Sequence, residues 1–491
     1  MLFNSLEFAL FFPSVTILFF ALPHNFRWFL LLAASCFFYM FFKPIYILIL
    51  GFTVLIDYFA GIWIDKQKDA KKKKGLLILS IVANVGVLIV FKYYNFIIIN
   101  LNLAINEMAN GHGLPLLNIL LPIGLSFHTF QAMSYTIEVY RENQKPETHF
   151  GIYALYVMFY PQLVAGPIER PQNMLHQFHE RKVFDYKNAR SGLILITWGL
   201  FKKVVIADRL GMFVSNVYAY PRDHRGIPLI IGTVFFAIQI FCDFSGYTDI
   251  AIGTARVMGF QLMTNFNSPF ISKSITEFWR RWHISLSTWF NDYLFKPIIT
   301  STRNWGRAAI AFGLFVTFFL SGVWHGAGWT FIIYGLMHGL GMIYEFYTKK
   351  FRKRVFGLMP SRLNNMISGF LTFSFVAISW IFFRSPRLTD AIYIIRNLGT
   401  DILNQTREII TNKHLARMDL LYLGQPGIDF ILSIFFILFI TAIHFAKKDL
   451  PLDTWITSKP KRIRWAAYYS VILLFITFGI FNKTSFIYFQ F

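Results

Sequence analysis

Long apolar runs separated by short polar segments dominate this sequence of 491 residues. Most of the runs are long enough to cross the hydrocarbon core of a bilayer as helices. The pattern predicts an all-α polytopic membrane protein with about 11 transmembrane helices in a single integral-membrane domain spanning residues 1–491. The runs are Leu6–Leu22, Phe26–Phe42, Pro44–Ile64, Gly75–Ile99, Leu114–Tyr140, Leu193–Val205, Gly226–Gly246, Ala311–Leu320, Trp329–Tyr347, Met366–Phe383, Ile428–Ala446 and Trp465–Ile480.

Two stretches depart from this pattern. Tyr153–Ile168 is apolar but contains Pro161 and Pro167, which do not fit an undisturbed helix, so a broken or re-entrant element is expected. A kinked ordinary helix is the alternative. Ser385–Gly427 is the longest polar stretch, and we expect amphipathic helices lying at the outer membrane surface.

Composition supports a membrane protein. Hydrophobic residues make up 55% of the chain and charged residues only 15%, whereas soluble domains carry about 25% charged residues. The net charge of +22 would favour nucleic-acid binding in a soluble protein, but no nucleic-acid-binding module is present in the sequence. Lysine and arginine instead cluster in Lys66–Lys74, Lys349–Arg354 and Lys459–Arg464, which places these loops in the cytoplasm and the N-terminus outside.

Cysteine and histidine spacing predicts no metal site. The two cysteines, Cys36 and Cys242, lie in apolar runs and support neither a disulfide framework nor a metal centre. His176 and His179 could share a helical face, but no third ligand is nearby in the sequence. The first apolar run is followed by no small-residue cleavage site, so it is interpreted as the first transmembrane helix.

Two segments carry a histidine directly after a tryptophan. In SITEFWRRWHISLSTWFNDY (Ser274–Tyr293) the histidine is His283, and in FLSGVWHGAGW (Phe319–Trp329) it is His325. Ser274 followed by Glu277 predicts a capped helix start. An apolar stripe at helical spacing then predicts one continuous helix, with Arg280 one turn below His283. The stripe consists of Phe278, Trp282, Leu286 and Trp289.

The glycines around His325 predict a loosened helix that other groups approach closely. An imidazole at membrane depth is costly, so a functional role is the default hypothesis. Either histidine could instead be a buried structural donor, and His283 could belong to an interfacial anchor. Asp243 and Asp249 are also costly in lipid and should face the interior or a wet cavity.

Five motifs together resemble the membrane-bound O-acyltransferase family, and within it the bacterial alginate O-acetyltransferase branch. They are PFISKSITEFWRRWHISLSTWFNDYLFKP (Pro269–Pro297), SGVWHGAGWTFIIYGLMHG (Ser321–Gly339), FHTFQAMSYTIEVYR, YPQLVAGPIERP and FCDFSGYTDIAIG. The resemblance covers nearly the whole chain. The related D-alanyl transferases of teichoic-acid modification share the two histidines, but the segments here are closer to the alginate type.

The resemblance implies a ring of transmembrane helices around a central tunnel in the bacterial cytoplasmic membrane. His325 matches the catalytic histidine of the family and His283 its second histidine. The residues assigned to the tunnel or acyl-donor region are Trp324, Trp282, Arg280, Asp243 and Pro167. An acyl group, expected to be acetyl, would pass from a cytoplasmic thioester to hydroxyls of an extracytoplasmic polysaccharide.

The donor implied by the resemblance is acetyl-CoA or an acyl carrier protein, with no permanently bound cofactor. The acceptor would be reached directly or through a periplasmic SGNH-type acetyltransferase. Imidazole suits the general base that such a reaction needs, and the chain has no G-x-S-x-G nucleophile elbow. A transporter or flippase, and a teichoic-acid-type D-alanyl transferase, remain alternatives.

Overall fold

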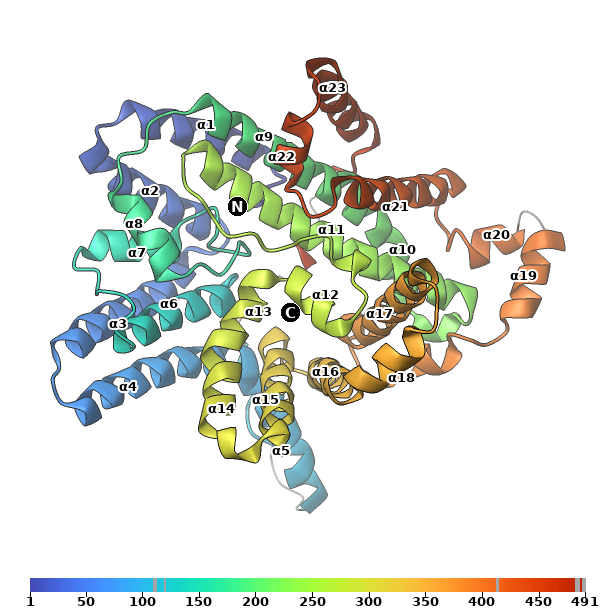
Figure 1. The fold of residues 1–491 in the computed structure, drawn as a ribbon, viewed down its shortest axis with the longest axis horizontal. Helices are drawn as coiled ribbons and strands as arrows, with labels where there is room; N and C mark the ends of the chain where they lie inside the picture. The colour runs from blue at the N-terminus through green and yellow to red at the C-terminus, as the bar shows by residue number, and fades with distance from the viewer. Residues whose placement is uncertain (109–112, 119–120, 412–414, 482–485, 488–491) are drawn as a thin grey trace. The chain divides into compact units, whose positions relative to one another are not determined.

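The computed structural model describes residues 1–108, 113–118, 121–411, 415–481 and 486–487, and no β-strand occurs among them. The chain forms two compact units. Unit 1 contains residues 1–196 and 247–263, and unit 2 contains residues 197–246 and 264–487. The order of the helices along the chain can be followed in Figure 1. The expected all-α class is confirmed for the described residues.

Unit 1 is built from the N-terminal helices. They are α1 (Leu6–Ala21), α2 (His24–Met40), η1 (Pro44–Tyr46), α3 (Ile47–Lys66), α4 (Ala70–Leu88), the π-helical η2 (Ile89–Tyr93), α5 (Tyr94–Met108), α6 (Leu125–Tyr140), α7 (Phe150–Met158), α8 (Pro171–His179) and most of α9 (Tyr186–Leu200). The last residues of α11 (Ile227–Val257) also belong to this unit. Within the expected run Leu114–Tyr140, α6 begins at Leu125, after Gly124 in the left-handed conformation.

A buried carboxylate joins three helices of unit 1. Asp57 in α3 accepts hydrogen bonds from Ser80 and Asn84 in α4 and from Thr136 in α6, the last two at 2.8 Å. All four side chains are buried. Because an unsatisfied carboxylate is costly at membrane depth, these neutral donors let Asp57 fix the mutual packing of α3, α4 and α6.

The proline-containing stretch of unit 1 is not helical. α7 ends at Met158 and α8 begins at Pro171, and the residues between them are turns and extended chain. Nearly all of this connection is buried, including Pro161 and Pro167. The expected broken element is confirmed, and the alternative of one kinked helix is wrong.

Unit 2 contains the remaining helices. They are η3 (Phe201–Ala207), α10 (Asp208–Ala219), η4 (Pro221–Asp223), most of α11, η5 (Pro269–Ile271), α12 (Ile275–Arg281), α13 (Ile284–Phe290), η6 (Asn291–Phe295), α14 (Lys296–Ser301), η7 (Arg303–Trp305), α15 (Arg307–His325), α16 (Trp329–Phe356), α17 (Ser361–Arg384), α18 (Leu388–Asn397), α19 (Ile402–Thr411), α20 (Leu415–Leu420), α21 (Gly427–Lys447), α22 (Leu452–Thr457) and α23 (Lys461–Phe478).

Glycines let α15 and α16 pack backbone to backbone. A Cβ added to Gly322 would lie 2.4 Å from the carbonyl oxygen of Phe331, and one added to Gly335 would lie 2.3 Å from that of Phe318. Side chains at these positions would force the helices apart. The close approach expected near His325 is therefore confirmed and serves helix packing.

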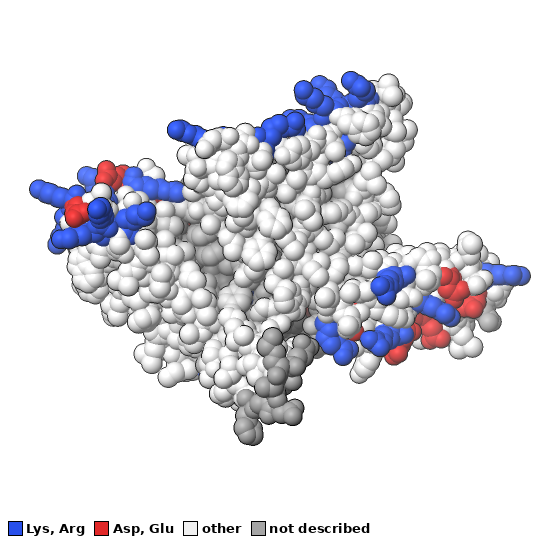
Figure 2. All heavy atoms as spheres, turned by 90° about the horizontal axis from the view of Figure 1, so that it is seen from below, with Lys and Arg blue, Asp and Glu red and all other residues white. Residues whose placement is uncertain are grey.

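Six helical segments among the described residues are long and apolar enough to cross a membrane, so the count of eleven is not confirmed. They are Pro44–Lys66, Ala70–Ile105, Ile227–Val257, Arg307–His325, Ser361–Arg384 and Gly427–Lys447. Many large apolar side chains are exposed, among them Leu10, Phe26 and Leu438. On the face drawn in Figure 2, lysine and arginine gather in patches, and wide areas between the patches carry no charged side chain. Such a surface is typical of a protein embedded in lipid.

The polar stretch Ser385–Gly427 forms the short helices α18, α19 and α20, as expected from its sequence. Within unit 2, Gln405 of α19 is buried and attaches this helix to the chain before α11. Its side chain accepts a hydrogen bond from the Ile227 amide at 2.8 Å and donates one to the Arg225 carbonyl at 2.9 Å. Leu403 and Ile410 of the same helix are exposed, so α19 is amphipathic.

Candidate active site

The helix that precedes His283 is capped at its first turn. The Ser274 hydroxyl accepts a hydrogen bond from the Glu277 amide at 3.0 Å, as the sequence predicts. The Glu277 carboxylate accepts a hydrogen bond from the Lys273 amide at 2.9 Å. Glu345, reaching across from α16, accepts the amides of Ile275 and Thr276 at 2.7 and 3.0 Å. These contacts satisfy amides at the start of α12 and attach it to α16.

The expectation of one continuous helix through His283 is wrong. α12 ends at Arg281, and α13 begins at Ile284. Trp282 is extended, and His283 adopts the left-handed conformation with φ of 43°. A non-glycine residue in this region costs on the order of 1 kcal/mol and persists only where its surroundings hold it there. His283 is fully buried at this break.

Asn265 provides the surroundings that hold His283. Its carbonyl oxygen accepts the Ile284 amide at 2.9 Å, and its Oδ1 accepts the amide and the hydroxyl of Ser285 at 3.1 and 2.9 Å. The same Oδ1 lies 3.1 Å from His283 Nδ1. An amide N–H only donates, so the shared Asn265 atom is an oxygen and His283 Nδ1 must carry a proton to bond to it. Burial lowers the pKa of His283 to about 3, and the neutral ring then has its lone pair on Nε2.

His325 ends a helix. It is the last residue of α15 and is buried, and Gly326 continues in extended conformation. A Cβ added to Gly326 would lie 2.2 Å from the ring of Phe331, so only glycine fits where the chain turns into α16. The sequence predicts a helix loosened around His325, but α15 is regular up to this residue and ends directly after it.

One tryptophan ring lies within contact range of both histidines. The ring centroid of Trp324 is 6.2 Å from that of His283 and 5.0 Å from that of His325. Tyr334 and Phe383 contact His325 from other sides, with centroids at 5.5 and 5.2 Å. The structure therefore brings the two histidines, 42 positions apart in the sequence, to one aromatic cluster in unit 2.

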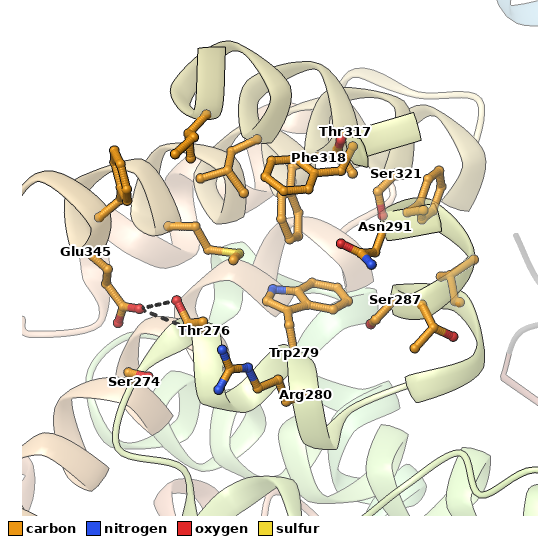
Figure 3. A pocket seen from close by; sticks show the side chains of 18 of the residues that line it. Ser274, Thr276, Trp279, Arg280, Ser287, Asn291, Thr317, Phe318, Ser321 and Glu345 are labelled. Carbon is orange, nitrogen blue, oxygen red and sulfur yellow. Dashed lines mark hydrogen bonds between the residues drawn. The ribbon is translucent and has the colours of Figure 1, made fainter. Parts of the chain in front are cut away.

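A cavity of about 760 Å³ opens next to this cluster. Its wall includes Ile284, which follows His283, and Ser321, which lies one helical turn before His325. Figure 3 shows Trp279 at the centre of the lining, with Arg280 and Glu345 on one side and Ser321 on the other. The basic residues of the wall are Arg280, Lys349 and Arg352. The cavity thus combines an apolar body with cationic groups suited to an anionic ligand.

A third histidine of unit 2 holds Trp279 in the cavity wall. The Trp279 indole donates to His338 Nδ1 at 3.1 Å, and His338 Nε2 lies 2.9 Å from the Ser379 hydroxyl. The Ser379 hydroxyl in turn donates to the Val376 carbonyl at 2.7 Å, so it accepts from His338 Nε2–H. His338 is fully buried and both its nitrogens are engaged. This ring is therefore a structural histidine.

Two of the other assigned residues fall in different places. Arg280 lines the cavity, whereas Trp282 is in the aromatic core and does not line this cavity. The Trp282 ring packs between Phe266 and Trp380, with centroids at 5.0 and 4.8 Å. In the described structure Trp282 contributes to packing, and its assignment to the tunnel region stays a prediction. Asn265, Trp279, His338 and Glu345 were missed because their roles depend on contacts between distant segments.

Asp243 and Pro167 do not line this cavity. Asp243 in α11 faces the protein interior, as expected, where its carboxylate is 2.8 Å from the Lys203 ammonium and accepts the Ile487 amide at 2.7 Å. Lys203 also binds Asp208 at 2.8 Å, so these groups form a buried ion-pair network. Pro167 belongs to unit 1, in the buried connection between α7 and α8.

Comparison with known proteins gives consistent matches. Residues 141–384 match the model of the membrane-bound O-acyltransferase family. A probable alginate O-acetylase, AlgI, of Pseudomonas aeruginosa is 38% identical over 80% of this chain and 73% of the relative. A peptidoglycan O-acetyltransferase of Helicobacter pylori is 33% identical over 75% of this chain and 73% of the relative. A teichoic acid D-alanyltransferase of Bacillus subtilis is 31% identical over 54% of this chain and 69% of the relative.

Proposed function

Because the chain belongs to the membrane-bound O-acyltransferase family, we propose that it transfers acetyl groups from a cytoplasmic thioester to hydroxyls of an extracytoplasmic polysaccharide. The family makes it a multi-pass membrane acyltransferase, and the transporter alternative is set aside. Relatives that match over most of their length are named for O-acetylation, which favours acetyl as the transferred group. The protein would lie in the bacterial cytoplasmic membrane with its N-terminus outside.

The observation that carries the proposal is the position of the cavity beside the two histidines. Ser321 in its wall is four residues before His325 on the same helix, a spacing that puts both on one face. Arg280, Lys349 and Arg352 offer positive charge to the phosphates of coenzyme A or of a carrier-protein prosthetic group. The apolar part around Trp279 would then hold the thioester arm.

The reaction follows from the properties of imidazole. An acceptor hydroxyl attacks the thioester carbonyl carbon while His325 takes the hydroxyl proton as general base. Collapse of the tetrahedral intermediate breaks the carbon–sulfur bond, and the proton on His325 passes to the departing thiolate. His283, with its lone pair on Nε2, would bind and orient the donor. The acceptor would receive the acetyl group directly or through a periplasmic SGNH-type acetyltransferase.

The test compares acetyl transfer in membranes that contain the wild type, His325→Ala or His176→Ala. His176 is an exposed histidine of unit 1 and is the matched control. With radiolabelled acetyl-CoA and the native polymer, label should enter the polymer with wild type and His176→Ala but not with His325→Ala. Equal labelling by all three proteins would refute the proposal.

The D-alanyl alternative rests on the similarity to the Bacillus subtilis relative. It predicts that a D-alanyl carrier protein, and not acetyl-CoA, supplies the transferred group. Supplying each donor separately to the same membranes distinguishes the two. If only D-alanine is incorporated, the transferred group is D-alanine and not acetyl, and the proposed role of His325 is unchanged.

A further inference from the structure

A second cavity, of about 740 Å³, opens between α16 and α17 in unit 2. The beginning of α12 forms its third wall, through Lys273 and Ile275. It shares only Glu345, Lys349 and Arg352 with the cavity beside the histidines. The other residues of its lining do not belong to the cavity beside the histidines. We call it the α16–α17 groove.

One part of the groove is apolar and open. Leu340 of α16 and Leu371 of α17 line it and are 56% and 52% exposed, and Phe375 of α17 also lines it. α17 is one of the six segments suited to crossing a membrane. Leu371 is exposed on such a helix and faces hydrocarbon rather than water, so this part of the groove is accessible to an acyl chain.

The other part of the groove is cationic. Lys273, Lys349 and Lys353 line it, all three are exposed, and none makes an ion pair with any residue that the structure describes. Glu345, the one carboxylate in the lining, is already engaged by the start of α12. The Nη1 atom of Arg352 lies 3.9 Å from the Oε1 atom of Glu345. The three lysines therefore leave positive charge that the groove itself does not neutralise.

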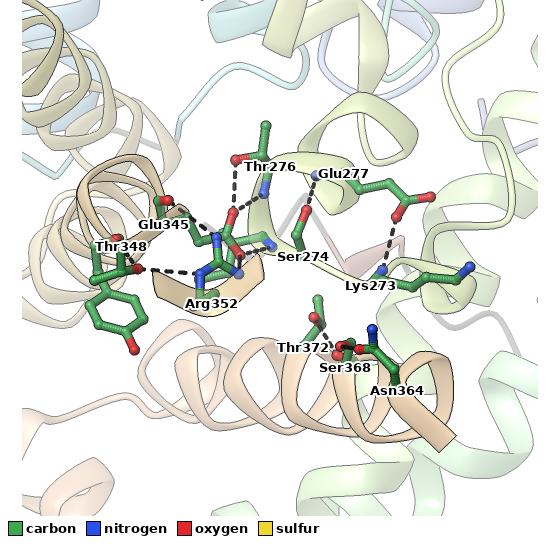
Figure 4. Close-up of polar contacts among 12 residues, drawn as sticks. Lys273, Ser274, Thr276, Glu277, Glu345, Thr348, Arg352, Asn364, Ser368 and Thr372 are labelled. Atoms are coloured by element: carbon green, nitrogen blue, oxygen red, sulfur yellow. Dashed lines mark hydrogen bonds and ion pairs between the residues drawn. The ribbon is translucent and has the colours of Figure 1, made fainter. Parts of the chain in front are cut away.

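A polar stripe on α17 borders the cationic part. Asn364, Ser368 and Thr372 follow one another at four-residue intervals, and all three line the groove. Figure 4 shows them on the side of α17 that faces Lys273 and Ser274. The Ser368 hydroxyl donates to Asn364 Oδ1 at 3.0 Å, which leaves the Asn364 amide group as a donor. Such groups suit the phosphate and hydroxyls of a lipid headgroup.

We propose that the α16–α17 groove binds one anionic phospholipid. Its phosphate lies against Lys273 and Lys353, its headgroup hydroxyls against Asn364, and an acyl chain along Leu340, Leu371 and Phe375. A soluble anion would use the lysines but not the apolar wall, whereas a neutral lipid would use only the wall. Because the groove has both a cationic part and an apolar wall, it favours a ligand that has both a negative charge and an acyl chain. This proposal does not depend on acyl transfer.

The test uses the full-length protein in nanodiscs and counts the lipids that stay bound in native mass spectrometry. The nanodiscs contain equal amounts of phosphatidylglycerol and phosphatidylcholine. Wild type should retain phosphatidylglycerol preferentially. Lys273→Gln combined with Lys353→Gln should weaken that retention about thirtyfold, because each lysine near an anionic headgroup contributes about 1 kcal/mol. Lys350→Gln, an exposed neighbour that does not line the groove, is the control and should behave as wild type.

A second variant tests the apolar wall. Leu371→Asn should weaken retention of phosphatidylglycerol although every lysine is still present. Glycerol 3-phosphate, a headgroup without chains, should not displace the lipid. Equal retention of both phospholipids by wild type would overturn the proposal. It would also be overturned if glycerol 3-phosphate fully displaced the bound phosphatidylglycerol. The same holds if the double variant no longer bound an acidic carrier protein but still retained phosphatidylglycerol, because the lysines would then be a protein-binding site.

Discussion

Asn265 Oδ1 lies 3.1 Å from His283 Nδ1 and accepts two further hydrogen bonds from Ser285. The arrangement fixes the tautomer of a fully buried histidine at the break between α12 and α13. Asn265 touches no reacting atom in the proposed mechanism and acts by positioning His283. The hydrogen bond made by one ring nitrogen of an imidazole determines which of the two nitrogens carries the proton.

We predict that Asn265→Ala raises the apparent KM for the thioester about tenfold, because His283 loses both its orientation and its fixed tautomer. A matched control is Ser285→Ala, which removes one donor to the same oxygen but leaves the contact with His283 in place. Steady-state kinetics of both variants, with a pH–rate profile for each, should show a changed profile for Asn265→Ala only. The same loss in both variants with unaltered pH profiles would indicate a purely structural role.

His283 and His325 should differ in their kinetic effects. We predict that His283→Ala raises the apparent KM for the thioester and leaves some turnover, because Ile284 beside it lines the donor cavity. Donor titrations with the purified variant measure this. If His283→Ala has no turnover while donor binding is unchanged, His283 takes part in the chemical step and the proposed division of roles fails.

Glu169 in unit 1 should make stability depend on pH. Burial raises its pKa to about 7, although the Met263 amide and the Asn173 side chain each donate to it at 2.6 Å. A carboxyl whose folded-state pKa lies above its unfolded value of 4.5 stabilises the fold most below that value. This contribution is lost as the pH rises toward 7 and through it.

We therefore predict that the wild type becomes less stable between pH 5 and about pH 8, and that Glu169→Gln flattens this dependence. Thermal unfolding in one detergent at a series of pH values measures it. Glu142→Gln is the control, because the hydrogen bond and the charge of Lys73 lower the pKa of that exposed carboxyl. An unchanged slope in Glu169→Gln would show that another group causes the dependence.

The topology is testable independently of activity. We predict that Lys66–Lys74, Lys349–Arg354 and Lys459–Arg464 all face the cytoplasm, because positive loops remain inside. Single cysteines placed in these loops should resist a membrane-impermeant thiol reagent in intact cells and react after permeabilisation. A cysteine at exposed Leu403 in α19, which is expected outside, is the positive control. Labelling of any of the three loops in intact cells would overturn the topology derived from it.

The sequence allowed prediction of features that depend on local patterns. The cap at Ser274 and the non-helical segment around Pro161 and Pro167 both follow from neighbouring residues. The break at His283 could not be predicted in this way. The apolar stripe continues across it at helical spacing, and the residue that stabilises the break, Asn265, lies 18 positions earlier.

The same limit applies to the cavity wall. Trp282 and Trp279 are three residues apart in one aromatic segment, and nothing local distinguishes them. Only contacts with other helices place Trp282 against Trp380 in the core and Trp279 beside His338 in the cavity wall. Glu345 likewise caps a helix that begins 70 residues earlier. Residues of this kind are defined by tertiary structure.

The most direct measurement of the central claim is acetyl transfer by purified His325→Ala, measured together with binding of the thioester donor. The account predicts that kcat falls about 10²–10⁴-fold, the usual contribution of a general base, while donor affinity and thermal stability stay close to wild type. Transfer at the wild-type rate would contradict the account. Loss of folded protein from the membrane would also contradict it, because His325 would then be a structural residue.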